Sequence, residues 1–182
     1  MNIAEITRIQ SEADLIYSSA EVEAAIERMA ADITLVLADK NPVILCLMIG
    51  GVVPTGKLLP LLDFPLQVEY VHATRYQGEI NGGKLHWIRK PTISLQDRHV
   101  LIVDDILDEG NTLVAMVEEC ESNQAKTIQT AVLADKQLGR ERSFKQADFT
   151  GLTVPNRYLF GYGMDYKEYL RNAPGIYAVK GL

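Results

Sequence analysis

The residues best suited to chemistry lie in an acidic stretch at positions 99–113, HVLIVDDILDEGNTL. Asp104 and Asp105 follow directly on an apolar run, and Asp108 comes three residues later. Glu109 then makes four carboxylates within six residues, although a helix cap needs only one. Such carboxylates repel one another unless a cation or a polyhydroxylated ligand offsets their charge. Because clustered ionisable groups mark functional sites, we expect this stretch to bind a ligand.

The neighbours of these acids predict how the stretch folds. Residues 100–103 are continuously apolar, which is typical of a strand buried on both faces of a parallel sheet. Gly110, Asn111 and Thr112 lead into an apolar segment that is expected to start a helix. Such a loop and helix N-terminus can bind a phosphate, with the acids holding its counter-ion. In open α/β sheets ligands bind at the carboxyl ends of strands, where this loop would lie.

Residues 100–113 resemble the phosphoribosyl pyrophosphate motif of the type I phosphoribosyltransferases. The resemblance implies that Asp104 and Asp105 bind ribose hydroxyls or the water molecules of a bound Mg²⁺. Carboxylates accept hydrogen bonds readily from vicinal hydroxyls, so the chemistry of these side chains agrees. The resemblance also implies that Asp108 is the catalytic base, which takes the N7 proton of a purine as N9 attacks the ribose.

By the same resemblance, the ribose 5′-phosphate binds at positions 109–112, which are Glu109, Gly110, Asn111 and Thr112. This chain departs from the family at Glu109, because most members have Thr or Ser there. The hydroxyl that would bind the phosphate is therefore missing. Backbone N–H groups and Thr112 would have to make that contact.

A second anion-binding turn is predicted at Gly50 and Gly51, directly after the apolar residues 43–48. Paired glycines between a strand and a helix let backbone N–H groups approach an anion closely, although an ordinary tight turn would have the same sequence. The turn is similar to the loop of purine phosphoribosyltransferases that binds pyrophosphate through main-chain amides. Many members have Lys or Arg where this chain has Ile49, so the contact would be mainly with the backbone.

Two interpretations are open for residues 73–91, which are polar and rich in glycine. They resemble the mobile lid that closes over the active site in this family, with Tyr76 matching the family's Ser-Tyr pair and Arg75 departing from it. Polar stretches of this length inside compact domains are usually functional. The alternative is an exposed hairpin that turns at Asn81-Gly82. In either case Trp87 is expected to anchor the segment to the body of the protein.

The C-terminal part resembles the pattern P-x-x-aromatic-x-x-G-Y-x-x-D-Y-x-x-Y-x-R of the hypoxanthine-guanine phosphoribosyltransferases. The resemblance implies that Tyr158 stacks on the purine and that Leu159 offers its main chain to the C2 edge of the base. Asp165 would hold Mg²⁺ directly or through water, and Arg171 would reach pyrophosphate. Tyr162 and Tyr169 are interpreted as packing residues instead.

Lys136 follows the predicted strand at 127–134 and matches the family lysine that hydrogen-bonds the purine 6-oxo group. An ammonium group is only a donor, so it would favour hypoxanthine and guanine over adenine, whose 6-amino group is also a donor. A buried donor facing a donor costs about 1–3 kcal/mol. Whether xanthine is also a substrate stays open. The other hypotheses are a transferase for orotate or uracil, a non-catalytic nucleotide- or RNA-binding regulator, and a nucleotide-binding scaffold.

The whole chain of 182 residues fits one α/β domain and can bury a full core. Helical spacing at 19–38, with Ser18 or Ser19 as N-cap, alternates with strand-like runs at 43–48, 65–72, 100–103 and 127–134. With the resemblance, this predicts a mostly parallel sheet flanked by helices in a core at about 19–134. A small hood would come from the terminal segments 1–18 and 135–182.

Composition argues against several classes of protein. A net charge of −6 disfavours a nucleic-acid partner, and no apolar run has the length of a membrane span. The N-terminus does not have the order of a signal peptide, and Cys46 and Cys120 lack the spacing of a zinc site. We therefore expect a cytoplasmic enzyme acting on small molecules, and the family resemblance implies a homodimer or homotetramer.

Overall fold

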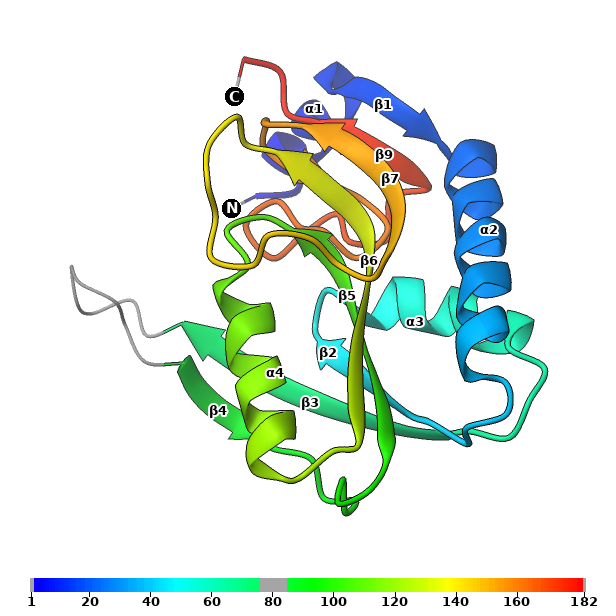
Figure 1. Cartoon of the computed structure of the whole chain (residues 1–182). Helices are drawn as coiled ribbons and strands as arrows, with labels where there is room; N and C mark the ends of the chain where they lie inside the picture. The colour runs from blue at the N-terminus through cyan, green and yellow to red at the C-terminus, as the bar shows by residue number, and fades with distance from the viewer. Residues whose placement is uncertain (1, 76–84, 182) are drawn as a thin grey trace.

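The computed structural model describes residues 2–75 and 85–181 (Figure 1). These residues form a six-stranded sheet with helices on both faces and a smaller three-stranded sheet at one end. The six strands run in the spatial order β4-β3-β2-β5-β6-β7, and all are parallel except β4, which is antiparallel to β3. In chain order they are β2 (Val43–Met48), β3 (Gln67–Arg75), β4 (Leu85–Arg89), β5 (His99–Leu107), β6 (Thr127–Gln137) and β7 (Phe149–Pro155).

Two apolar layers cover the faces of this sheet. One lies beneath α2 (Ser19–Leu37), α3 (Val52–Leu58) and the short η1 (Leu59–Leu61), and the other beneath α4 (Asn111–Ser122). Alternate residues of β2 divide between them: Ile44 packs with α2, whereas Leu45 packs with α4. This is the alternation that a strand requires when both of its faces are buried.

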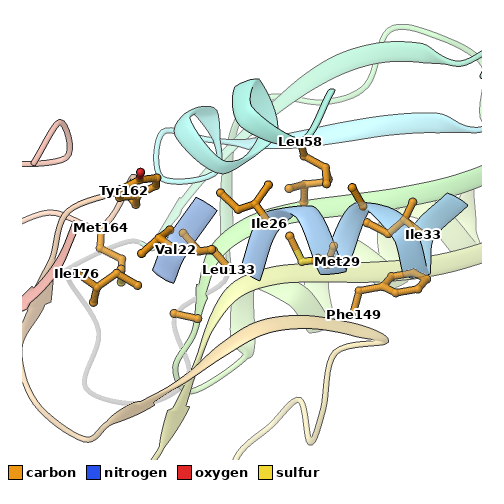
Figure 2. Packing of buried hydrophobic residues seen from close by; sticks show 14 of the residues in the cluster. Val22, Ile26, Met29, Ile33, Leu58, Leu133, Phe149, Tyr162, Met164 and Ile176 are labelled. Atoms are coloured by element: carbon orange, nitrogen blue, oxygen red, sulfur yellow. The ribbon is translucent and has the colours of Figure 1, made fainter. Parts of the chain in front are cut away.

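Helix α2 is the longest element and links the two sheets. It begins at a capping box, in which the Ser18 hydroxyl accepts from the Glu21 N–H and the Glu21 carboxylate accepts from the Ser18 N–H. Figure 2 shows its apolar side chains in contact with both sheets. Residues of this layer labelled there are Val22, Ile26, Met29 and Ile33 of α2, Leu58 of α3, Leu133 and Phe149 of the larger sheet, and Tyr162, Met164 and Ile176.

The smaller sheet brings the two ends of the chain together, and we call it, with α1, the hood. Its order is β1 (Asp14–Ser18), β9 (Gly175–Ala178) and β8 (Leu159–Phe160), all antiparallel. Ile6 and Ile9 of α1 (Ile3–Glu12) pack beneath it against a cluster that contains Phe160. The predicted hood of terminal segments on a mostly parallel α/β core is thus confirmed.

The larger sheet differs from the prediction in two places. β7 lies in it, so the sheet continues to Pro155, well beyond the predicted core boundary at residue 134. Phe149 and Val154 are buried in the α2 layer, which explains why this segment joins the core. The second difference is that β5 does not end at residue 103: it continues through Asp104 and Asp105, which remain paired with β6.

The remaining fold predictions concern single residues. Trp87 packs against the α4 layer, as expected for an anchor, and both cysteines are free and buried. Tyr76 and the proposed turn at Asn81-Gly82 lie outside the described residues. Among the helices of the described chain, none combines the length and the hydropathy needed to cross a bilayer.

Candidate active site

The predicted site residues meet where three parallel strands end. The Gly50-Gly51 turn follows β2, the loop that begins at Asp108 follows β5, and Lys136 is the residue before the end of β6 at Gln137. Since β2, β5 and β6 are neighbours in the sheet, these carboxyl ends form one continuous edge. This is the place where open α/β sheets bind ligands, as the sequence predicted.

The two acids at the end of β5 are held by the main chain. Asp104 accepts a hydrogen bond of 2.9 Å from the Asp105 N–H, and Asp105 accepts one of 2.8 Å from the Ile106 N–H. Burial is the main cause that raises the pKa of Asp104 well above its ordinary value, and the negative charge of Asp105 is the second cause. Burial also raises the pKa of Asp105. A cation or a set of hydroxyl groups would stabilise both carboxylates in their charged form.

Glycine lets the Gly50-Gly51 turn touch these acids. A Cβ at Gly50 would overlap the Asp105 carboxylate, and one at Gly51 would lie 2.6 Å from the carbonyl oxygen of Val103. Gly163, at a φ of +108°, lies against the other side of the turn, where a Cβ would overlap the carbonyl oxygen of Gly50. Three segments that are distant in the sequence therefore meet without side chains between them. The Ile49 side chain is half exposed and brings no positive charge.

The loop predicted to bind the 5′-phosphate connects β5 to α4. Gly110 is the N-cap of α4 and has a φ of +81°, a conformation that favours glycine. The first turn of α4 is closed by the Val114 N–H, which donates to the Gly110 carbonyl, so earlier N–H groups have no partner inside the helix. A cavity of about 200 Å³ opens here. Its lining residues are Asp104, Asp105, Ile106, Leu107, Asp108, Glu109, Gly110, Thr112 and Leu113.

A larger cavity of about 580 Å³ adjoins this loop and contains the residues predicted to recognise a base. Lys136 Nζ donates to Asp108 Oδ2 at 2.8 Å, and the lysine side chain is only 13% exposed. Tyr158 presents an exposed ring that packs edge-on against Tyr166, with the centroids 5.2 Å apart. The cavity is lined by Asp105, Ile106, Asp108, Lys136, Asn156, Arg157, Tyr158, Leu159, Met164 and Asp165.

Arg171 joins the acidic strand to the C-terminal segment. It forms an ion pair of 2.6 Å with Asp165 and donates to the Gly163 carbonyl oxygen at 2.6 Å. Its guanidinium also lies 4.0 Å from the Asp105 carboxylate. The structure thus brings Arg171 and Asp165 to the same site as Asp105. Their roles toward pyrophosphate and Mg²⁺ stay predictions.

Tyr162 is buried, as its interpretation as a packing residue requires, but it also makes polar contacts. Its hydroxyl donates to the Glu23 carboxylate at 2.6 Å, and Glu23 pairs with Lys57 of α3 at 2.7 Å. The hydrogen bond from the Lys57 ammonium is the main cause that lowers the pKa of Glu23, and the bond from the Tyr162 hydroxyl is the second. This network connects the C-terminal segment to α2 and to α3, the helix that follows the Gly50-Gly51 turn.

Sequence reasoning missed Arg142, whose largely covered guanidinium holds the ends of two strands. It pairs with Asp135 at 2.6 Å and donates to the carbonyl oxygens of Leu107 at the end of β5 and of Lys136 in β6. Those two strands carry the acidic loop and the predicted base-recognition lysine. An arginine in a polar segment looks like a solvated residue, so the sequence contained no signal for this role.

The acidic residues suit a magnesium ion that is held partly by substrate. Among the described residues, no group of three His, Cys, Asp or Glu side chains forms a ready-made metal site. Mg²⁺ usually takes one or two carboxylates and completes its shell with water and substrate phosphates. Asp104 and Asp105, whose burial disfavours their charged forms, fit such a partial set of ligands.

Comparison with known proteins defines the class. The model of the phosphoribosyl transferase domain matches residues 12–167. The chain belongs to the phosphoribosyl transferase family, as its acidic motif predicted.

Several relatives are similar over nearly the full chain. The hypoxanthine-guanine-xanthine phosphoribosyltransferase of Tritrichomonas foetus is 32% identical over 91% of this chain and 91% of its own. The hypoxanthine-guanine phosphoribosyltransferase of Streptococcus pneumoniae is 31% identical, with 91% and 92% covered. Among solved structures, a hypoxanthine phosphoribosyltransferase from Trypanosoma cruzi in complex with IMP has a TM-score of 0.84 at 25% identity, covering 93% of this chain and 92% of that one.

Proposed function

We propose that this protein is a 6-oxopurine phosphoribosyltransferase of purine salvage. It moves the 5-phosphoribosyl group of phosphoribosyl pyrophosphate to N9 of hypoxanthine or guanine, and it releases pyrophosphate with IMP or GMP. The observation that carries the proposal is the contact of 2.8 Å between Lys136 and Asp108 beside the Tyr158 ring. A cytoplasmic homodimer or homotetramer is part of the proposal and rests on the family resemblance.

The paired Lys136 and Asp108 match one edge of a 6-oxopurine. A base protonated on N7 presents an acceptor, O6, beside a donor, the N7–H. An ammonium and a carboxylate that lie side by side offer the complementary donor and acceptor. Tyr158 supplies an aromatic face for the ring, and Leu159 lies behind it in β8, opposite Ala178. Adenine, with an amino group at position 6, would leave Lys136 facing another donor.

In the reaction, N9 forms a bond to the anomeric carbon while the bond from that carbon to pyrophosphate breaks. Asp108 accepts the N7 proton. The Gly50 N–H and Arg171 bind the leaving pyrophosphate, whereas the Gly51 N–H already donates to the Leu47 carbonyl oxygen at 2.9 Å. The loop at 109–112 holds the 5′-phosphate. Asp104 and Asp105, with Asp165 as a further ligand, would hold Mg²⁺, which neutralises charge on the departing group.

The test is nucleotide formation by the purified protein with Mg²⁺ and phosphoribosyl pyrophosphate, using hypoxanthine, guanine, xanthine and adenine in turn. We expect product from hypoxanthine or guanine and little from adenine. Comparable rates with adenine and hypoxanthine would refute the proposed role of Lys136. Xanthine is the second candidate substrate, because the relative from Tritrichomonas foetus is named for it. Phosphoribosyl pyrophosphate binding without turnover on any base would favour a regulator.

The proposed base is tested separately by Asp108→Asn. General base catalysis contributes about 10²–10⁴-fold, so we expect a loss of that order in kcat. Because Asp108 is not assigned to the phosphates, the dissociation constant for phosphoribosyl pyrophosphate should change little, which calorimetry can measure. Turnover equal to the wild type would show that another group takes the N7 proton.

A further inference from the structure

One segment, residues 140–144, packs along the loop proposed to bind the 5′-phosphate, and we call it the strap. The Ser143 N–H donates to the Glu109 carbonyl oxygen at 3.0 Å, and the Ser143 hydroxyl donates to the Asn111 side chain. Phe144 lies directly over Gly110, where a Cβ on the glycine would be 2.7 Å from the Phe144 nitrogen. The strap therefore contacts three consecutive residues of the loop.

Its fourth contact is an ion pair that involves the residue at which this chain departs from its family. Both nitrogens of the Arg140 fork meet the Glu109 carboxylate: Nη1 donates to Oε2 at 3.2 Å and Nη2 donates to Oε1. A paired arrangement of this kind is the strongest geometry between a guanidinium and a carboxylate. Arg140 is 62% exposed and Glu109 33%, so the pair stands at the surface of the loop.

The charge of Glu109 is unfavourable at this place unless it is neutralised. Glu109 lines the cavity of about 200 Å³ that the first turn of α4 also lines through Thr112 and Leu113. A ribose 5′-phosphate carries up to two negative charges, and an unpaired carboxylate beside it would repel it. The Arg140 guanidinium neutralises that carboxylate and so reduces its repulsion of a phosphate bound at this loop.

We propose that Arg140 is a positioning residue that makes Glu109 compatible with 5′-phosphate binding. The inference rests on the proposed function, because it takes phosphoribosyl pyrophosphate as the ligand of this loop. Here a neutralised carboxylate occupies the position of the hydroxyl that most members of the family have. The strap presents Arg140 to Glu109 and, through Ser143, orients the loop itself.

The test measures the dissociation constant of phosphoribosyl pyrophosphate by calorimetry, together with kcat and KM, for Arg140→Ala, Glu109→Gln and the double variant. Arg140→Ala exposes the Glu109 charge, and we expect weaker binding by about fivefold with kcat nearly unchanged. Removing the exposed charge in the double variant should restore the dissociation constant to within about twofold of wild type. The deficit of Arg140→Ala should also shrink at about 1 M salt, where the Debye length is about 3 Å.

Arg8→Ala is the matched control. Arg8 is 63% exposed and pairs with Glu12 of the same helix, so its loss changes the net charge equally without breaking the ion pair between Arg140 and Glu109. Arg8→Ala should leave the dissociation constant of phosphoribosyl pyrophosphate unchanged. The inference is overturned if Arg140→Ala binds as wild type does, or if the double variant stays as weak as Arg140→Ala, because the arginine would then act only by holding the strap. A wild type that binds the ligand but forms no nucleotide would refute the proposed function alone, since the binding comparison still decides the role of Arg140.

Discussion

Alanine at position 50 would place a methyl group where the Asp105 carboxylate lies. The farthest of the three carboxylate atoms would be 2.6 Å from the new Cβ, and the other two would be nearer. Ordinary contacts between such atoms begin at about 3.5 Å, so the carboxylate has to move by about 1 Å or more. The φ of Gly50 is not positive, so alanine fits the backbone and the conflict is confined to Asp105. A misplacement of about 1 Å at a reacting centre can cost about 10²-fold in rate.

We therefore expect Gly50→Ala to lose about 10²-fold in kcat/KM for phosphoribosyl pyrophosphate while it still folds. Nucleotide formation with hypoxanthine gives the rate, and a thermal melt shows whether the variant is folded. Gly56→Ala in α3 is the control, because a Cβ there meets nothing within 4 Å. Alanine is the better helix former by about 0.5–1 kcal/mol, so this control should be slightly more stable and fully active.

Two outcomes would refute this reasoning. If Gly50→Ala keeps more than about half of the wild-type kcat/KM, the position of the Asp105 carboxylate does not matter for the reaction at the scale of about 1 Å. If the melting temperature falls so far that the variant is unfolded in the assay, the glycine is needed for the fold, and its link to Asp105 is not the explanation.

The remaining predictions concern stability. Asp148 accepts hydrogen bonds from the N–H and the hydroxyl of Thr130, which is buried. Asp148→Ala should therefore lower the free energy of unfolding, measured in urea, by about 3 kcal/mol. A loss below about 1 kcal/mol would contradict this. The Thr92 hydroxyl, and after it the Arg89 guanidinium, lower the pKa of Glu69 to about 2. The ionised Glu69 therefore stabilises the fold fully above the unfolded pKa of about 4.3, and this contribution is lost as pH falls toward 2. The stability difference between wild type and Glu69→Gln should shrink from about pH 6 to about pH 3, and a constant difference would contradict it.

The sequence predicted the fold class and most of the residues at the strand ends, because both follow from short-range patterns. A continuous apolar run predicts a buried strand, and the carboxyl ends of neighbouring parallel strands must lie at one edge. That Lys136 and Asp108 face one cavity follows from this rule, since β5 and β6 are adjacent. The family resemblance placed Tyr158 in the same cavity.

Other features depend on contacts that no local pattern reveals. β7 was missed because its sequence, FTGLTVP, contains a glycine and a proline, which are unfavourable inside a strand, and pairing with β6 makes it a strand. β5 appeared to end before the acids, because carboxylates are unusual inside a parallel sheet, yet pairing with β6 continues through Leu107. Arg140 and Arg142 lie in a polar segment, and their partners are identified only when the chain has folded.

The pairing within the hood sheet determines when the hood can fold during synthesis. The central strand of its sheet is β9, and β1 and β8 pair with β9 and not with each other. On the ribosome, β1 emerges early and has to wait for a partner that is translated more than 150 residues later. Tyr158 and Asp165 are synthesised before β9, so the chain contains these two predicted site residues before the sheet that supports them exists. A released chain that is truncated between residues 165 and 175 would therefore contain every strand of the larger sheet and most of the site's side chains, but it would lack the central strand of the hood.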